Sequence, residues 1–345
     1  MEKLVWDQAL IEKYNYSGPR YTSYPTALEF DEAFGYDDLL NAAQRYPTRH
    51  LSLYVHIPFC HKLCYYCGCN KVITRHQHKA DDYLDYLEKE IRFQAKHFKD
   101  RSVSQLHWGG GTPTFLDPNQ IKRLMAILRS EFNFLPDAEM SIEVDPREIA
   151  LDTIDLLAQQ GFNRLSLGIQ DFDKKVQLAV NREQDEAFIF ELLDRAKANG
   201  FRSTNLDLIY GLPHQTKASF ARTLEKVMEI APARLTTFNY AHLPSRFAAQ
   251  RKLRDEWLPS ADEKFALMRL AIEKLCEYGY DFIGMDHFAR PDDELAIAQR
   301  NRSLHRNFQG YSAHAQCDSI GFGVSAVSVV SISVVASVTC GTAVV

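Results

Sequence analysis

Four cysteines lie close together in the segment HIPFCHKLCYYCGCN, residues 56–70. The first three, Cys60, Cys64 and Cys67, have the spacing C-x3-C-x2-C. An iron–sulfur cluster that is bound by three cysteines leaves one iron free to bind a further ligand. A structural zinc ion instead needs four closed ligands, usually from two separated pairs. The asymmetric spacing therefore favours a [4Fe-4S] cluster over zinc.

Zinc stays open as an alternative because the same segment holds other candidate ligands. Cys69 follows Cys67 closely, and His56 and His61 lie on either side of Cys60. A zinc-stabilised binding protein would take its fourth ligand from this group.

Composition places these thiols in a reducing compartment. The chain has 345 residues, a formal charge of −5 at pH 7, and a first segment, MEKLVWDQAL, without the apolar core of a signal peptide. We therefore expect a cytoplasmic protein, in which clustered cysteines are more often metal or redox groups than disulfides. The net charge gives no general attraction to nucleic acid or anionic membranes, so neither is an expected partner. The other cysteines, Cys276, Cys317 and Cys340, are scattered and are interpreted as ordinary thiols.

Apolar runs and helical patterns alternate through the middle of the chain. The expected strands are residues 51–57, 103–108, 140–144, 163–169, 203–211, 234–243 and 280–286. The expected helices are residues 78–98, 118–132, 151–160, 185–199, 217–230 and 262–277. This alternation predicts an α/β fold, a partial (β/α)6-type TIM-like barrel of parallel strands with an N-terminal arm. Catalytic groups are then expected at the carboxyl ends of the strands.

Three parts of the chain differ in composition. Residues 1–50 are predicted to form the N-terminal arm, and residues 51–323 the barrel. Residues 324–345 form an uncharged tail of mostly Val, Ser, Ala and Thr. Its length invites a membrane-spanning interpretation. The frequent hydroxyl side chains and the lack of aromatic or basic anchors favour an atypical, aggregation-prone tail without a membrane span.

The motif C-x3-C-Y-x-C is similar to the signature of radical S-adenosylmethionine (SAM) enzymes. That resemblance implies that SAM binds the free iron and is split into methionine and a 5'-deoxyadenosyl radical, so that the cofactor supplies the chemistry and the protein positions it. Longer motifs, from about residue 6 to about residue 327, resemble the oxygen-independent coproporphyrinogen III oxidase family. They are HWGGGTPT, SIEVDPRE, NRLSLGIQDF, NREQ, NLDLIYGLP, FNYAHLP, GMDHFARPDDELA and HRNFQGY.

The resemblance implies a set of residues that contact SAM. They are Tyr54, Tyr66, Gly110, Gly111, Thr112, Glu143, Gln170, Arg182, Asp207, Ala241 and Val327. The glycines let the backbone approach a ligand, and their amides suit a carboxylate. Asp207 lies in the apolar run LDLIYG, where a charge needs a partner or a ligand. Without a role in binding, Glu143 would be a solvated residue at a strand end, Arg182 a surface residue and Tyr54 a core residue.

The same resemblance predicts the reaction and its partners. Two propionates of coproporphyrinogen III become vinyl groups, which gives protoporphyrinogen IX without oxygen. The family uses two SAM molecules, and an electron donor and an electron acceptor that the sequence does not identify. A monomer is expected. Arg20 and Arg290 are candidate propionate partners, and Cys69 either acts near the substrate or packs beside the cluster.

One departure from the family and one rival function are also expected. Members of the family continue into a mainly helical C-terminal domain that the sequence after Val327 does not resemble, so we expect a truncated and poorly active chain. The rival is a haem-binding chaperone, a relative that usually lacks the fourth cysteine and carries HN-x2-YW. This chain has Cys69 and reads HRNFQGY at residues 305–311, which favours the oxidase.

Overall fold

The fold is described from a computed structural model of the chain. The structure describes residues 6–14, 33, 35–307, 310–314, 316–330 and 335–336. Arg20 and Cys340 therefore lie outside the described residues, as do residues 1–5, 15–32 and 34 of the predicted N-terminal arm.

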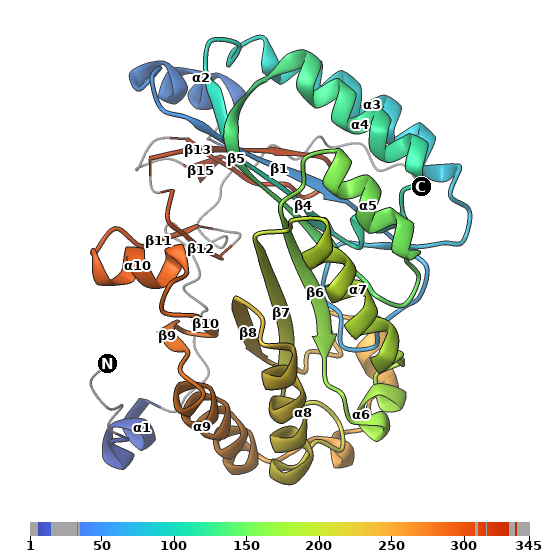
Figure 1. The fold of residues 1–345 in the computed structure, drawn as a ribbon, viewed down its shortest axis with the longest axis vertical. Helices are drawn as coiled ribbons and strands as arrows, with labels where there is room; N and C mark the ends of the chain where they lie inside the picture. The colour runs from blue at the N-terminus through green and yellow to red at the C-terminus, as the bar shows by residue number, and fades with distance from the viewer. Residues whose placement is uncertain are drawn as a thin grey trace.

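Six strand–helix units follow one another along the described chain. They are β1 (Leu51–Ile57) and α3 (Lys79–Ala95), β4 (Ser102–Gly110) and α4 (Pro118–Glu131), β5 (Asn133–Val144) and α5 (Leu151–Gln159), β6 (Arg164–Gln170) and α7 (Glu186–Ala198), β7 (Ser203–Tyr210) and α8 (Lys217–Ile230), β8 (Arg234–Asn239) and α9 (Ala261–Glu277). The predicted (β/α)6 alternation is confirmed, and Figure 1 shows it as a curved sheet with these helices on its outer side.

Shorter elements connect and extend these units. The helices are α1 (Gln8–Tyr14), α2 (Tyr36–Arg45), α6 (Lys174–Ala179) and α10 (Glu294–Arg300). The strands are β2 (Phe59–Cys60), β3 (Val72–Ile73), β9 (Asp281–Gly284), β10 (His287–Ala289), β11 (His305–Asn307), β12 (Gly310–Ser312), β13 (Asp318–Phe322), β14 (Ser328–Val329) and β15 (Val335–Ala336).

The main sheet is open rather than closed. Its order within the described residues is β15-β14-β13-β1-β4-β5-β6-β7-β8-β10-β9, and all pairs from β13 to β8 are parallel. Within the described residues, the two end strands β15 and β9 do not pair with each other, so the barrel is partial, as predicted.

The prediction of a further parallel strand at residues 280–286 is wrong. The strand there, β9, pairs antiparallel with β10. Only Met285 and Asp286 separate the two strands, and Gly284 and Met285 both have positive φ. A connection this short makes a hairpin, because parallel neighbours need a crossover of a dozen or more residues.

Strand β13 was missed in the sequence and lies in an important place. It pairs in parallel with β1 from Leu51↔Asp318 to Val55↔Phe322. The following strand β14 pairs antiparallel with β13, and Ala326, Ser328 and Val330 are buried. The first residues of the segment that composition sets apart as a tail thus join the sheet, while the division into arm, barrel and tail stays a prediction.

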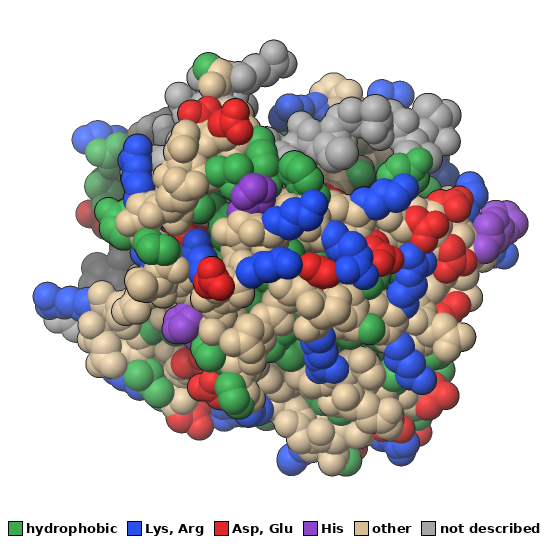
Figure 2. All heavy atoms as spheres, turned by 90° about the horizontal axis from the view of Figure 1, so that it is seen from above, with side chains coloured by type: hydrophobic (Ala, Val, Ile, Leu, Met, Phe, Trp, Pro, Cys, Tyr) green, Lys and Arg blue, Asp and Glu red, His purple; other side chains and the backbone are tan. Residues whose placement is uncertain are grey.

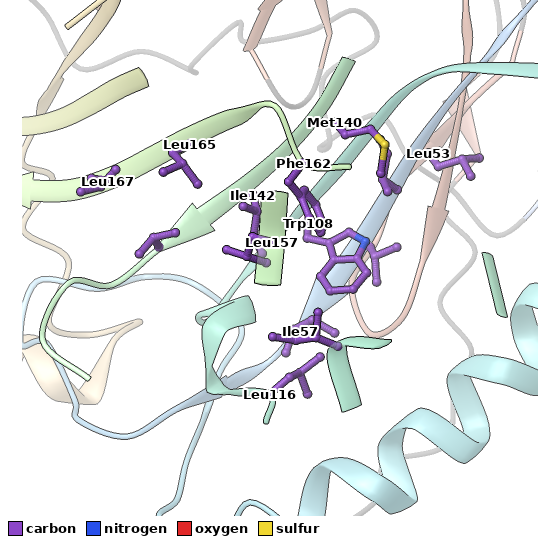
Figure 3. Packing of buried hydrophobic residues seen from close by; sticks show 14 of the residues in the cluster. Leu53, Ile57, Trp108, Leu116, Met140, Ile142, Leu157, Phe162, Leu165 and Leu167 are labelled. Carbon is purple, nitrogen blue, oxygen red and sulfur yellow. The ribbon is translucent and has the colours of Figure 1, made fainter. Parts of the chain in front are cut away.

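Side chains alternate across the strands between a covered face and an inner face. On the covered face, Leu106, Trp108, Ile142 and Leu165 are buried beneath the helices, and Figure 3 shows Trp108 beside Phe162 in this core. Burial of such side chains is the main favourable contribution to folding.

The inner face is polar, which is unusual for parallel strands because both of their faces are normally apolar. Its residues are Gln105 and His107 on β4, Glu139, Ser141 and Glu143 on β5, Arg164 and Ser166 on β6, and Asn205 and Asp207 on β7. These positions alternate with the core residues, as the two-residue period of a strand requires. A polar concave face is suited to holding a polar ligand.

Capping side chains set the starts of several helices. Asp117 accepts from the amides of Asn119 and Gln120 at the start of α4, at 2.8 and 2.9 Å. Asp185 does the same for α7. Such caps satisfy amides that the helix leaves unpaired.

On the face over α3 and α4, positive and negative side chains are interspersed (Figure 2). Ion pairs join the two helices there, among them Arg92–Glu131 and Arg123–Asp85. Among the described residues, every helix is too short or too polar to cross a membrane.

Candidate metal and cofactor site

The cysteine loop begins directly after β1, at the carboxyl edge of the sheet. Cys60 ends β2, and Cys64 is buried, whereas Cys60 and Cys67 are partly exposed. Within the described residues, no three histidine, cysteine or acidic ligand atoms of this loop lie within 4.8 Å of one another. Thiolates around one zinc ion would be about 4 Å apart, given Zn–S bonds of about 2.3 Å. The wider spread of these donors fits a multinuclear cluster better than zinc.

Other segments hold the loop in place. The amide of Tyr65 donates to the carbonyl of Val180 at 3.0 Å, and Asn181 Nδ2 donates to the carbonyl of Leu63 at 2.7 Å. Lys71 Nζ donates to the carbonyls of Cys67 and Cys69 at 3.0 and 3.2 Å. The thiols are therefore presented by a braced loop.

The thiols differ in acidity. A hydrogen bond from the thiol of Cys69 lowers the pKa of Cys67 to about 6, with help from Lys71 and against the effect of burial. Donating that bond raises the pKa of Cys69, and burial raises the pKa of Cys60 to about 12. Cys69 thus lies against a predicted cluster ligand, which favours its packing beside the cluster over a place at the substrate.

The glycine run packs against the cysteine loop and Glu143. The amide of Gly110 donates to Glu143 Oε2 at 3.2 Å, and that of Gly111 donates to the carbonyl of Ile57 at 2.9 Å. The amide of Thr112 donates to the carbonyl of Phe59 at 2.8 Å. These three amides have partners inside the protein. The amides of Gly110 and Gly111 are therefore not free for a ligand carboxylate, while the SAM contact of this run stays a prediction.

Gly109 is required because the side chains of Glu143 and His107 lie close to its backbone. A Cβ atom there would lie 2.9 Å from Glu143 Oε1 and 3.1 Å from His107 Nε2. The missing side chain lets Glu143 lie across the end of β4, where its carboxylate is partly exposed.

Tyr54, Glu143 and Val327 line one cavity of about 250 Å³. The other lining residues are His107, Asn307, Ser319, Ser325 and Val329. His107 Nδ1 lies 2.6 Å from Ser141 Oγ, and its ring stacks on Tyr54 at 5.8 Å between centroids. His107 was not selected as a candidate from the sequence. Its position could be inferred, because alternate residues of β4 face the same side of the sheet as Glu143 on the neighbouring strand β5.

Tyr66 and Ala241 belong to a second group of candidates. Gln250 Nε2 donates to both of their carbonyls, at 2.9 and 3.2 Å. Gln250 is 2% exposed and was missed in the sequence, because nothing near it in the chain marks this role. It connects the cysteine loop to the end of β8.

Arg182 lies in this second group, buried beside the cysteine loop rather than at the surface. Its Nη1 donates to Cys64 Sγ at 3.3 Å and to Asp145 Oδ2 at 3.2 Å. Asp207 accepts from Ser166, Asn205 and Thr236, so this carboxylate has partners on the inner face, as a charge in an apolar run requires.

Gln170 carries a buried polar atom without a partner in the described part of the protein. It has φ +67° at the end of β6, and its buried Oε1 has no hydrogen-bond partner among the described residues. Buried polar atoms are nearly always paired. The unpaired oxygen is suited to accept from a cofactor's amino or hydroxyl group.

Comparison with known proteins identifies the family of this site. Residues 54–227 match the radical SAM superfamily. The oxygen-independent coproporphyrinogen III oxidase of Salmonella typhimurium is 65% identical over 329 residues, which cover 95% of this chain and 72% of the relative. The corresponding protein of Escherichia coli is 64% identical over 330 residues, which cover 96% and 72%.

This chain belongs to the oxygen-independent coproporphyrinogen III oxidase family. The solved structure of coproporphyrinogen III oxidase from Escherichia coli, described as a radical SAM enzyme, superposes with a TM-score of 0.91 and 63% identity. It covers 95% of this chain and 74% of that chain. As a radical SAM enzyme of this family, the protein uses a [4Fe-4S] cluster and SAM, and the donor set and the unpaired Gln170 oxygen described above fit both.

Arg290, a predicted propionate partner, does not lie near the cysteine loop. Arg290 follows β10 and donates through Nη2 to the carbonyl of Ala231 at 3.4 Å, and its guanidinium lies over the ring of Tyr280. These contacts place it before the start of β8, at the edge of the sheet opposite the cysteine loop. The structure thus places Arg290 away from the cysteine loop, and its role as a propionate partner stays a prediction.

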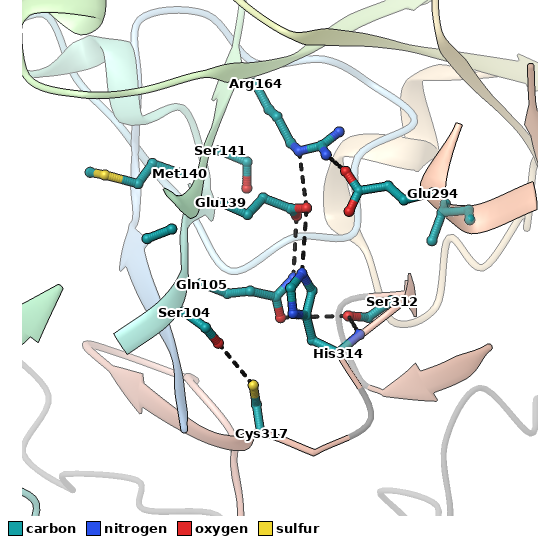
Figure 4. A network of polar contacts seen from close by, with 12 residues as sticks. Ser104, Gln105, Glu139, Met140, Ser141, Arg164, Glu294, Ser312, His314 and Cys317 are labelled. Atoms are coloured by element: carbon teal, nitrogen blue, oxygen red, sulfur yellow. Dashed lines mark hydrogen bonds and ion pairs between the residues drawn. The ribbon is translucent and has the colours of Figure 1, made fainter. Parts of the chain in front are cut away.

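A second group of ionisable residues lies at that opposite edge of the oxidase barrel (Figure 4). Glu139, Glu294 and His314 are close enough to bind one metal ion. Arg164, however, pairs with both carboxylates and already supplies a positive charge to them. We interpret this group as an ion-pair network that connects β5, β6 and α10.

Gly109→Ala is expected to weaken SAM binding to the reconstituted oxidase about tenfold, or about 1.4 kcal/mol. The added methyl group would displace Glu143, a predicted SAM contact. Binding is measured by calorimetric titration without oxygen. Gly35→Ala is the matched control, because its Cβ would meet only Asp38 Oδ2, at 3.9 Å. Equal affinity of both variants would contradict the role of Glu143.

Proposed function

We propose that the protein converts coproporphyrinogen III into protoporphyrinogen IX by oxygen-independent oxidative decarboxylation. The observation that carries this proposal is the position of Cys60, Cys64 and Cys67, on a braced loop at the carboxyl edge of a partial barrel with a polar inner face. When bound there, the cluster and SAM supply a 5'-deoxyadenosyl radical that removes a hydrogen atom from a propionate side chain. Each of two propionates loses that hydrogen atom, carbon dioxide and one electron, and becomes a vinyl group.

The residues of the chain bind and orient the reactants. Burial lowers the pKa of His56 and raises that of Tyr54, so both side chains are neutral where Tyr54 Oη and His56 Nδ1 lie 3.1 Å apart. His56 is held in turn by the carbonyl of Asn70, 3.0 Å from Nε2. Tyr54 is thus a neutral, hydrogen-bonded part of the cavity lining, in which the side chain of Glu143 is suited to the ammonium group of SAM.

The candidate residues support two SAM molecules for each active site. Tyr54, Glu143 and Val327 line the cavity between β4 and β14. Tyr66, Arg182 and Ala241 lie instead around the cysteine loop and Gln250. The long list of candidate contacts, carried on two sets of elements, supports this proposal.

The remaining partners are proposed from the reaction. A reductant must supply the electron that starts SAM cleavage, and an acceptor must take the electron released with carbon dioxide. We propose that both are separate molecules and that the oxidase works as a cytoplasmic monomer. Arg20 stays a candidate propionate partner, but it lies outside the described residues.

The test is turnover by the full chain after anaerobic reconstitution with iron and sulfide. With SAM, a reductant and coproporphyrinogen III, we expect protoporphyrinogen IX, 5'-deoxyadenosine and two molecules of carbon dioxide for each product. Haem bound in equal amount to protein, without SAM cleavage, would instead support the haem-binding chaperone. A colourless protein that contains only zinc would contradict both.

A further inference from the structure

Arg147 is a buried arginine that touches a predicted cluster ligand. It follows β5 in the segment DPRE, and its side chain is 4% exposed. Its Nη2 lies 3.2 Å from Cys64 Sγ, with the guanidinium as donor. Nothing in the motif or in the expected SAM contacts assigns a role to this residue.

The direction of this guanidinium is fixed by three other contacts. Arg147 Nε donates to Asp145 Oδ1 at 2.9 Å, and Nη2 donates to Asp145 Oδ2 at 2.6 Å. Nη1 donates to the carbonyl of Asn181 at 3.1 Å, and Asn181 itself holds the cysteine loop through Leu63. Two-pronged arginine–carboxylate pairs of this kind are strong and geometrically specific. Contacts within the protein therefore aim this donor at the sulfur of Cys64.

Charge is concentrated around one sulfur atom. Arg182 donates a second hydrogen bond to Cys64 Sγ, and the single carboxylate of Asp145 pairs with both arginines. Two positive charges and one negative charge leave an excess positive charge beside the Cys64 thiolate. Cys67 differs, because its donors are Cys69 and one cation, Lys71, so Cys64 is the cysteine that two arginines contact.

We infer that Arg147 is a positioning residue that raises the reduction potential of the cluster by donating a hydrogen bond and positive charge to Cys64. The inference rests on the proposed function, because it requires a cluster bound to Cys64. Hydrogen bonds to cluster sulfurs and local charge set the potentials of iron–sulfur centres. Reduction adds negative charge to the cluster, so a nearby cation stabilises the reduced form. Only the reduced cluster can donate the electron that cleaves SAM.

A purely structural role for Arg147 predicts a different result. The same two loops are also joined by the ion pair Lys62–Glu148, 2.7 Å long and largely exposed, which touches no sulfur. Glu148→Gln removes this connection next to Arg147 without changing a contact to a cluster ligand. It is therefore the matched control.

The experiment measures the midpoint potential of the reconstituted full chain by electron paramagnetic resonance during a redox titration, together with bound iron. The variants are Arg147→Met, which removes the charge and the donors, and Arg147→Lys, which keeps the charge. For Arg147→Met we expect the ratio of reduced to oxidised cluster at a fixed potential to fall about tenfold, a shift of about 59 mV to more negative values. Arg147→Lys should recover part of this shift, and Glu148→Gln should show none.

Each possible result either supports or refutes the role of Arg147 in setting the reduction potential. A loaded Arg147→Met variant with the wild-type potential would overturn it, as would an equal shift in Glu148→Gln. If Arg147→Met does not take up iron, Arg147→Gln decides instead, and an unchanged potential there refutes the inference. If the wild-type protein takes up no cluster, the proposed function fails together with the inference about Arg147. If the wild-type protein takes up the cluster and Arg147→Met keeps the wild-type potential, only the inference about Arg147 fails.

Discussion

Cys64→Ala is expected to reduce both bound iron and reductive SAM cleavage to background. The substitution removes one of three predicted cluster ligands, and Cys64 is the buried one, with two arginines donating to its sulfur. The loss should exceed the about 10–100-fold effect that follows mutation of a residue supporting a metal ligand. Cys60→Ala and Cys67→Ala should behave in the same way. Iron content, the visible spectrum and the yield of 5'-deoxyadenosine measure the effect.

Two other cysteines provide the controls for this experiment. Cys317 lies 3.0 Å from Ser104 Oγ, away from the loop, and Cys317→Ala should keep iron and SAM cleavage. Cys69→Ala should also keep the cluster, because Cys69 hydrogen-bonds to Cys67 rather than completing the ligand set. A Cys69 variant that loses all iron, or a Cys64 variant that keeps it, would show that the assigned ligands are wrong.

Local patterns in the sequence were sufficient for the framework of the fold. The six strand–helix units are long and strongly periodic. Their local pattern therefore predicts helix or strand correctly, whatever distant segments they contact. The short elements were less predictable. Strand β9 joins a hairpin because of a two-residue turn, and β13, a strand of five residues shortly before the tail, was missed. Pairing partners that are far apart in the chain leave no local mark.

The polar inner face was present in the sequence and can be found there by its period. In SIEV, the polar Ser141 and Glu143 alternate with the buried Ile142 and Val144, and RLSLGIQ repeats the alternation on β6. In parallel strands, which are usually apolar on both faces, such alternation indicates a ligand-facing side. Applying this test would have added His107 to the candidates.

Contacts between distant segments explain the site residues that were missed. Arg147 and Cys64 are 83 residues apart, and Gln250 and Tyr66 are 184 residues apart. No spacing rule connects such pairs. The glycine run shows that a motif does not reveal which amides already have acceptors, since those of Gly110 and Gly111 donate to Glu143 and to the carbonyl of Ile57.

Asp318→Asn is expected to lower the free energy of unfolding by about 3–5 kcal/mol, because Arg49 and Arg101 then lose the carboxylate that pairs with both of them. Asp318 is 1% exposed at the start of β13, where its oxygens accept from Arg49 Nε at 2.8 Å and from Arg101 Nη2 at 2.7 Å. Urea unfolding of the full chain measures the change.

The effect should reach the active site, because Asp318 fixes the strand that lies beside β1. Loosening β13 moves Ser319 and the following Val327, which line the cavity with Tyr54, so SAM affinity should fall together with stability. Asp281→Asn is the control: its partner Arg300 is half exposed, and such surface pairs contribute about 0.2–1 kcal/mol. If both variants unfold at the same urea concentration, the buried pair does not anchor β13. If only Asp318→Asn is destabilised, the strand that closes the cofactor cavity depends on a buried charge at its first residue.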